Sequence, residues 1–83
     1  MSSETADFLL FSKMKRIIFD KMLRQLRKEH DLTQAQLANK IGVGEPTIRG
    51  WESGSNQTSF EMLYTLAQLF NVTVGQLLGV EEY

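Results

Sequence analysis

The chain has 83 residues, 42% hydrophobic and 23% charged, with a formal net charge of −1 and no cysteine. This length fits one small domain, and without cysteine neither disulfides nor cysteine-ligated zinc can stabilise it. The longest apolar runs, Phe8–Phe11 and Ile17–Phe19, are far shorter than the roughly 20 residues that span a bilayer. The first residues are acidic, where a secretory signal would be basic, so we expect a cytoplasmic protein with no membrane partner.

The near-neutral total charge hides an uneven distribution. All nine basic residues lie between positions 13 and 49, where four acidic residues leave a net charge of +5, and the six remaining acidic residues give the other segments −6. Such a division favours one face for a polyanion and another face kept soluble or used for self-contact. The alternative is that the basic residues form an ordinary solvated helix face.

Capping patterns and helical periodicity predict an all-α domain over residues 18–80, and no alternating strand pattern competes with them. Three threonines have capping-box spacing, Thr33 with Gln36, Thr58 with Glu61, and Thr73 with Gln76. The predicted helices run over residues 19–31, 33–42, 45–53, 58–71 and 73–79. The fourth has an apolar stripe that we expect to be buried, formed by Phe60, Leu63, Leu66, Ala67 and Phe70.

Residues 1–17 are expected to form an N-terminal extension that lengthens the first helix back to Asp7 or Ser12. Their apolar residues would align on one helix face together with Ile18. This face would be either a lid on the core or a dimer surface, with disorder as a further alternative.

The second and third predicted helices form a helix-turn-helix unit, because a short glycine-containing turn, residues 42–44, joins them. Ala38 is small enough for close approach of the two helices, and the residues expected to wedge them apart are Leu37, Val43 and Ile48. In such a unit the outward residues of the second helix meet base edges in the major groove of DNA. These residues are Glu45, Pro46, Thr47, Arg49 and Gly50.

The stretch from Leu23 to Gly79 resembles the phage-repressor/Cro-type, or XRE-like, helix-turn-helix family. The most specific matches are Leu32-Thr33-Gln34, Leu37-Ala38, Ile48 with Trp51-Glu52 and Gly54, Leu63 with Leu66-Ala67, and Gln76-Leu77-Leu78. The resemblance implies a five-helix, lambda-repressor-like domain that binds double-stranded operator DNA as a two-fold dimer.

The resemblance also implies roles for individual residues. Glu45, Pro46, Arg49 and Gly50 match the base-reading positions and Thr47 a flanking one, while the positions that contact phosphates are Thr33, Gln34, Lys40, Ser55, Asn56 and Thr58. Arg49 is expected to be the strongest reader, because its guanidinium can bond guanine O6 and N7 together. The alternative for Arg49 is a surface salt bridge to Glu45 or Glu52. Gln34 and Lys40 have ordinary surface positions as their alternatives.

Other residues are expected to be structural. Arg27 and Glu52 match a pair that forms a buried salt bridge in the family, and Trp51 is expected in the core rather than on a stacking surface. His30 is the only histidine and is expected to pack or to cap a helix. The sequence has no nucleophile motif, phosphate loop or metal-ligand cluster, so we expect neither an enzyme nor a cofactor or metal site.

Together these observations predict a prokaryotic or phage-encoded transcriptional regulator, a repressor that binds a palindromic operator as a homodimer. The dimer surface is expected at the C-terminus, at Val72, Val74, Leu77, Leu78 and Val80, with the N-terminal apolar segment as the second candidate. No small-molecule ligand is expected, and an antagonist or toxin protein is a candidate partner. The alternative function is an antitoxin-like or other protein-interaction module on a helix-turn-helix scaffold.

Overall fold

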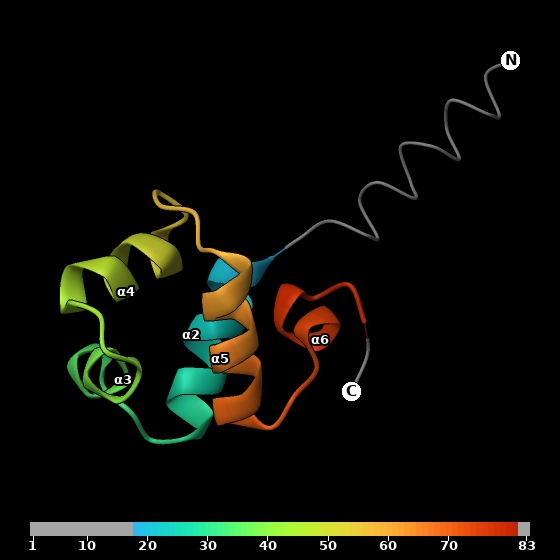
Figure 1. The fold of residues 1–83 in the computed structure, drawn as a ribbon, viewed down its shortest axis with the longest axis horizontal. Helices are drawn as coiled ribbons and strands as arrows, with labels where there is room; N and C mark the ends of the chain where they lie inside the picture. The colour runs from blue at the N-terminus through green and yellow to red at the C-terminus, as the bar shows by residue number, and fades with distance from the viewer. Residues whose placement is uncertain (1–17, 82–83) are drawn as a thin grey trace, which may run out of the picture.

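The computed structural model describes residues 18–81, which form five α-helices and no strand (Figure 1). The helices are α2 (Phe19–Glu29), α3 (Gln34–Ile41), α4 (Glu45–Ser53), α5 (Phe60–Phe70) and α6 (Val74–Leu78). The predicted all-α, five-helix class is confirmed. No helix within this range is long and apolar enough to cross a membrane. The expectations for residues 1–17 lie outside the described residues.

Two of the three predicted capping boxes set helix starts. The Thr33 hydroxyl accepts from the Gln36 N–H at 3.0 Å and the Gln36 side chain accepts from the Thr33 N–H at 2.9 Å, so the first turn of α3 satisfies its own donors. Thr73 and Gln76 form the same box at the start of α6. Helix α3 ends at Gly42 in the left-handed conformation, with φ +76°, which costs glycine little.

The third predicted box is wrong. Ser59 caps α5 instead, its hydroxyl accepting from the Met62 N–H at 3.1 Å. The Thr58 hydroxyl is buried and has no hydrogen-bond partner among residues 18–81. Phe60 was expected in the buried stripe, but it occupies the first turn of α5, where its side chain is 88% exposed.

The core joins all five helices. Its buried members are Leu23 and Leu26 of α2, Leu37 and Ala38 of α3, Ile48 and Trp51 of α4, Leu63, Leu66, Ala67 and Phe70 of α5, and Leu77 of α6. Each fully buried aliphatic side chain contributes about 1.5–3 kcal/mol. The Trp51 ring meets the Phe19 ring edge-on, with centroids 6.3 Å apart, so α4 is fixed against the start of α2. His30 caps the end of α2, and its ring lies 5.0 Å from that of Phe70.

The C-terminal segment is part of this core. Leu77 is fully buried, so its expected place on a dimer surface is wrong. Val72, Val74 and Leu78 are half-buried and pack against the core, and Val80 is also half-buried. The Ile18 N–H donates to the Leu78 carbonyl at 2.9 Å and ties the end of α6 to the start of α2.

Candidate nucleic-acid interface

The turn between α3 and α4 holds the two helices in a fixed crossing. The Val43 N–H donates to the Ala38 carbonyl at 3.0 Å, and Leu37 and Ile48 are fully buried on either side of the turn. The buried side of α4 therefore faces the core. On the opposite side Glu45, Pro46 and Arg49 are exposed, and Thr47 is half-buried.

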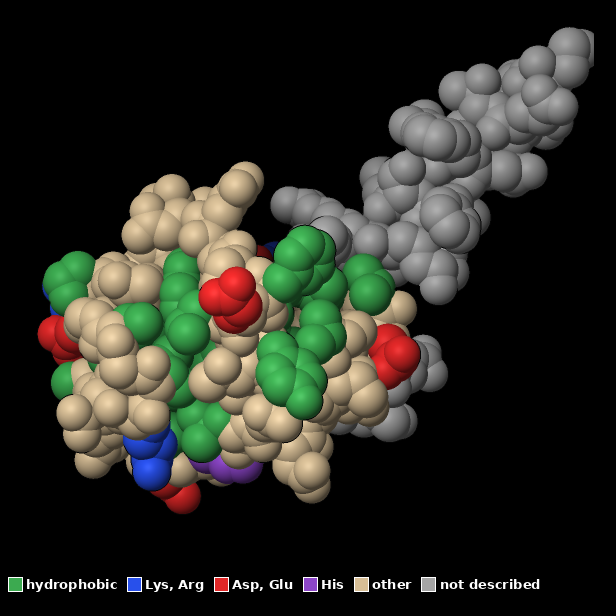
Figure 2. All heavy atoms as spheres, viewed as in Figure 1, with side chains coloured by type: hydrophobic (Ala, Val, Ile, Leu, Met, Phe, Trp, Pro, Cys, Tyr) green, Lys and Arg blue, Asp and Glu red, His purple; other side chains and the backbone are tan. Residues whose placement is uncertain are grey.

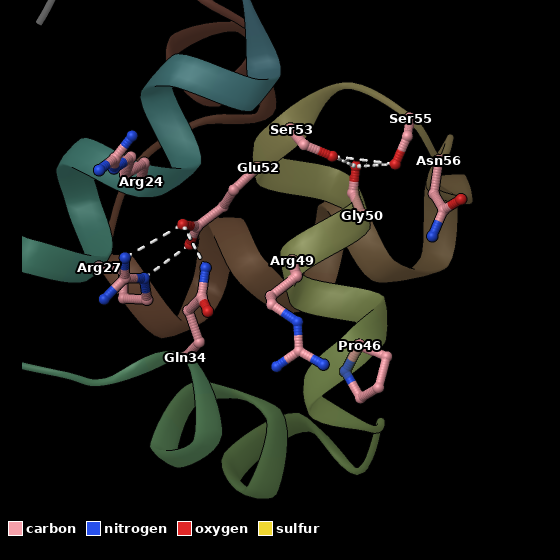
Figure 3. A pocket seen from close by; sticks show the side chains of 10 residues that line it. All are labelled: Arg24, Arg27, Gln34, Pro46, Arg49, Gly50, Glu52, Ser53, Ser55 and Asn56. Atoms are coloured by element: carbon pink, nitrogen blue, oxygen red, sulfur yellow. Dashed lines mark hydrogen bonds and ion pairs between the residues drawn. The ribbon is translucent and has the colours of Figure 1, made fainter.

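A cleft of about 560 Å³ lies alongside α4 (Figure 3). It is lined by Arg24 and Arg27 of α2, Gln34 of α3, Pro46, Arg49, Gly50, Glu52 and Ser53 of α4, and Ser55 and Asn56 of the following loop. Three arginines against one glutamate make its lining cationic. Such a concave surface of one sign concentrates anions.

Arg24 is one of two cleft residues, with Ser53, that were not predicted from the sequence. It is exposed, and it forms no ion pair with any residue from 18 to 81. The sequence does indicate its position: Arg24 precedes Arg27 by three residues, and residues three apart share one helix face. Arg24 therefore offers an uncompensated positive charge beside α4.

Arg27 and Glu52, which were expected to pair, form a buried ion pair at the back of the cleft. Arg27 Nε and Nη2 donate to Glu52 Oε2 and Oε1 at 2.6 and 3.0 Å. Arg27 Nη1 donates to the Leu32 carbonyl at 2.8 Å. Gln34 Nε2 donates to Glu52 Oε1 at 3.1 Å (Figure 3). Helices α2, α3 and α4 are thus joined at one carboxylate. Gln34 is half-buried and bonded there, so it is not an ordinary exposed first-turn residue.

Arg49 points into the cleft from the exposed side of α4. Its Nη1 atom lies 2.8 Å from Glu45 Oε1, the salt bridge that was the alternative for this residue. The two side chains are 52% and 44% exposed, and an exposed pair of this kind is worth about 0.3–0.5 kcal/mol. A guanine edge or a phosphate can replace Glu45 at little cost.

Gly50 lies on the outward side of α4 as expected, but it is not exposed there. It is buried, because the Asn56 side chain lies over it: a Cβ atom built on Gly50 would be 1.9 Å from Asn56 Nδ2. The side of the helix was predicted correctly, but the loop that returns over it was not foreseen.

The residues expected to contact phosphate are placed unevenly. Lys40, Ser55 and Asn56 are exposed, and the last two line the cleft. The N–H of Thr33 is already bonded to Gln36, so it is not a free donor for a phosphate. The Thr58 hydroxyl is buried, which is inconsistent with a phosphate contact.

The comparisons with known proteins agree with this geometry. A family model described as a helix-turn-helix matches residues 23–77. The chain belongs to the helix-turn-helix family. This helix-turn-helix chain is 43% identical over 60 residues to the uncharacterized HTH-type transcriptional regulator YobD of Bacillus subtilis, a match that covers 72% of the chain and 54% of YobD.

Two further helix-turn-helix relatives are informative. The cryptic phage CTXphi transcriptional repressor RstR of Vibrio cholerae is 35% identical over 65 residues, which are 78% of this chain and 59% of RstR. The crystal structure of a transcriptional regulator from Listeria innocua superposes with a TM-score of 0.75 at 29% identity, covering 82% of this chain and 64% of that one. The chain thus spans a little over half the length of YobD and RstR.

Proposed function

We propose that this chain is a sequence-specific DNA-binding regulator that inserts α4 into the major groove of an operator. The observation that carries the proposal is the cationic cleft beside an exposed α4 face in a helix-turn-helix chain. The −1 net charge of the chain does not oppose this role, because the six basic residues between positions 18 and 81 all lie on α2, α3 and α4, which frame the cleft.

Within this proposal the residues in and near the cleft have different roles, some contacting bases and others the phosphate backbone. Arg49 reads a guanine and exchanges its exposed bond to Glu45 for bonds to O6 and N7, while Pro46 and Thr47 contact a neighbouring base by van der Waals packing. Arg24 and Lys40 neutralise phosphates, and Ser55 and Gln34 contact the backbone between them. Arg27 stays in its buried pair with Glu52 and positions Gln34.

We further propose that the regulator binds a palindromic operator as a homodimer and represses by occluding the promoter. Phe60 and Tyr64 lie one turn apart on α5 and are 88% and 60% exposed. Hydrophobic side chains reach the surface near α5 and α6 in the face shown in Figure 2. A two-fold contact centred on these aromatics would bury them, with Leu78 and Val80 at its edge. This surface replaces the one that included Leu77.

The test is fluorescence anisotropy with duplex fragments of the gene's own promoter at two salt concentrations. We expect salt-dependent binding because phosphate neutralisation releases counterions. Arg49→Ala should lower the affinity for the preferred fragment by about 1–3 kcal/mol and affect unrelated DNA far less. Lys28→Ala, a change of an exposed basic residue outside the cleft lining, is the matched control.

Failure to bind any fragment at low salt, with the fold intact, would refute the DNA-binding role and favour the protein-interaction alternative. Sedimentation equilibrium tests the dimer separately. Replacing Phe60 and Tyr64 together by serine should give a monomer, whereas Gln68→Ala on an exposed position of α5 should not. A doubly substituted chain that remains dimeric would contradict the α5 surface.

A further inference from the structure

The outward face of α4 has one position without a side chain. Gly50 lies one turn after Pro46 and next to Arg49, and all three line the cleft. The opposite face of α4 is formed by Ile48 and Trp51, which are buried in the core. A side chain at position 50 would therefore project toward the same surface as Arg49.

A neighbouring residue fills that place. A Cβ atom built on Gly50 would lie 1.9 Å from Nδ2 and 2.6 Å from Cγ of Asn56. The Asn56 amide thus occupies the space into which a residue-50 side chain would grow. Figure 3 shows this amide projecting from the loop alongside α4.

The backbone of the loop is fastened to α4 at the same residue. The Ser55 and Asn56 N–H groups donate to the Gly50 carbonyl at 3.0 and 3.1 Å. The hydroxyls of Ser53 and Ser55 lie 3.2 and 3.4 Å from that oxygen. Asn56 is therefore held beside α4 by main-chain bonds that do not involve its own side chain.

The Asn56 amide keeps its hydrogen-bonding capacity for a ligand. Asn56 is exposed, and its side chain makes no hydrogen bond to another residue between 18 and 81. A primary amide presents one acceptor and one donor group side by side, which matches N6 and N7 of adenine in the major groove. A phosphate, in contrast, offers only acceptors and would use the NH₂ group alone.

We propose that Asn56 reads a base in place of the missing side chain of position 50, with adenine as its preferred base. This inference rests on the DNA-binding function proposed above. It assigns to the loop after α4 a specificity role, whereas the family resemblance implied a phosphate contact for Asn56. Gly50 contributes by leaving the space that the amide occupies.

The experiment is selection of binding sequences from a pool of random duplex DNA by the full chain. It is carried out with the wild type and with Asn56→Ala, Gly50→Ala and Gln57→Ala. Gln57 is the matched control, since it is exposed in the same loop but does not line the cleft. Circular dichroism verifies folding of each variant. In Gly50→Ala the Asn56 amide must rotate away, and Asn56 Cβ, 3.1 Å from the new methyl group, must shift by a few tenths of an ångström.

We expect Asn56→Ala to lose the preference for one base pair in each half-site, by about tenfold, while the other positions keep theirs. Gly50→Ala should lose the same preference because its methyl group displaces the amide, and Gln57→Ala should behave as the wild type. An unchanged preference in Asn56→Ala, with or without a uniform loss of affinity for all DNA, overturns the inference. If the wild type selects no sequence at all, the DNA-binding function itself fails, which is a different result.

Discussion

The sharpest stability prediction concerns Arg27→Met, which keeps an unbranched side chain that can fill the space of the arginine stem and removes the charged guanidinium. Glu52 would lose both bonds from Arg27, and the Leu32 carbonyl would lose a third. The Glu52 side chain is only 5% exposed, so water cannot replace these partners fully. Removing one member of a buried pair costs about 3–5 kcal/mol.

This loss is large for a small domain. A chain of 83 residues is expected to have about 4–12 kcal/mol of unfolding free energy. With an m-value of about 1 kcal/mol/M, the urea midpoint should fall by about 3–5 M. Trp51 is the only tryptophan and is buried, so its fluorescence reports the transition.

The matched control is the double variant Arg27→Met with Glu52→Met. It removes both charges and leaves no stranded carboxylate, so its stability should recover to within about 2 kcal/mol of the wild type. A single Arg27→Met variant that loses less than about 1 kcal/mol would refute the reasoning, since Glu52 would then be adequately solvated without its partner.

Two further substitutions test local features. Gly42→Ala should lower the unfolding free energy by about 1–2 kcal/mol, because alanine is strained at φ +76°. No steric clash should add to this loss, since no atom of residues 18–81 lies within 4 Å of the position of the new methyl group. Thermal unfolding measures the change. No measurable loss would mean that the turn adopts another conformation without penalty. Thr58→Val should raise the unfolding free energy by about 1 kcal/mol, because it removes a buried hydroxyl that has no hydrogen-bond partner in the described part of the chain. The substitution should leave the affinity for DNA unchanged, because a buried hydroxyl cannot contact a phosphate. A lower affinity of the Thr58→Val variant would instead support the predicted phosphate contact of Thr58.

Local patterns predicted most of the fold. The bounds of α4 follow from Pro46 in its first turn and Gly54 after its last, and the two true capping boxes follow from side-chain and backbone bonds only three residues apart. The false box shows the limit of such signals. Thr58 and Ser59 are adjacent, both can cap a helix, and packing buries the first while the second bonds Met62.

The missed parts of the candidate site depend on contacts between distant segments. Nothing in the local pattern shows that Asn56 returns over Gly50, because that contact depends on how the loop bonds to the Gly50 carbonyl. The exposure of Phe60 likewise depends on whether another element covers the first turn of α5, and its burial was predicted from periodicity alone. Periodicity assigns a helix face but not what covers it.

Because Gly50 and Asn56 are in contact, the residue types at these two positions should vary together among relatives. In relatives with a loop of the same length, a residue larger than glycine at position 50 should occur with a smaller side chain at position 56, since both cannot fill one space. The same limit applies to engineering. A graft of α4 alone into another scaffold would leave Asn56 behind, so a transfer of this surface has to carry residues 45–56 together.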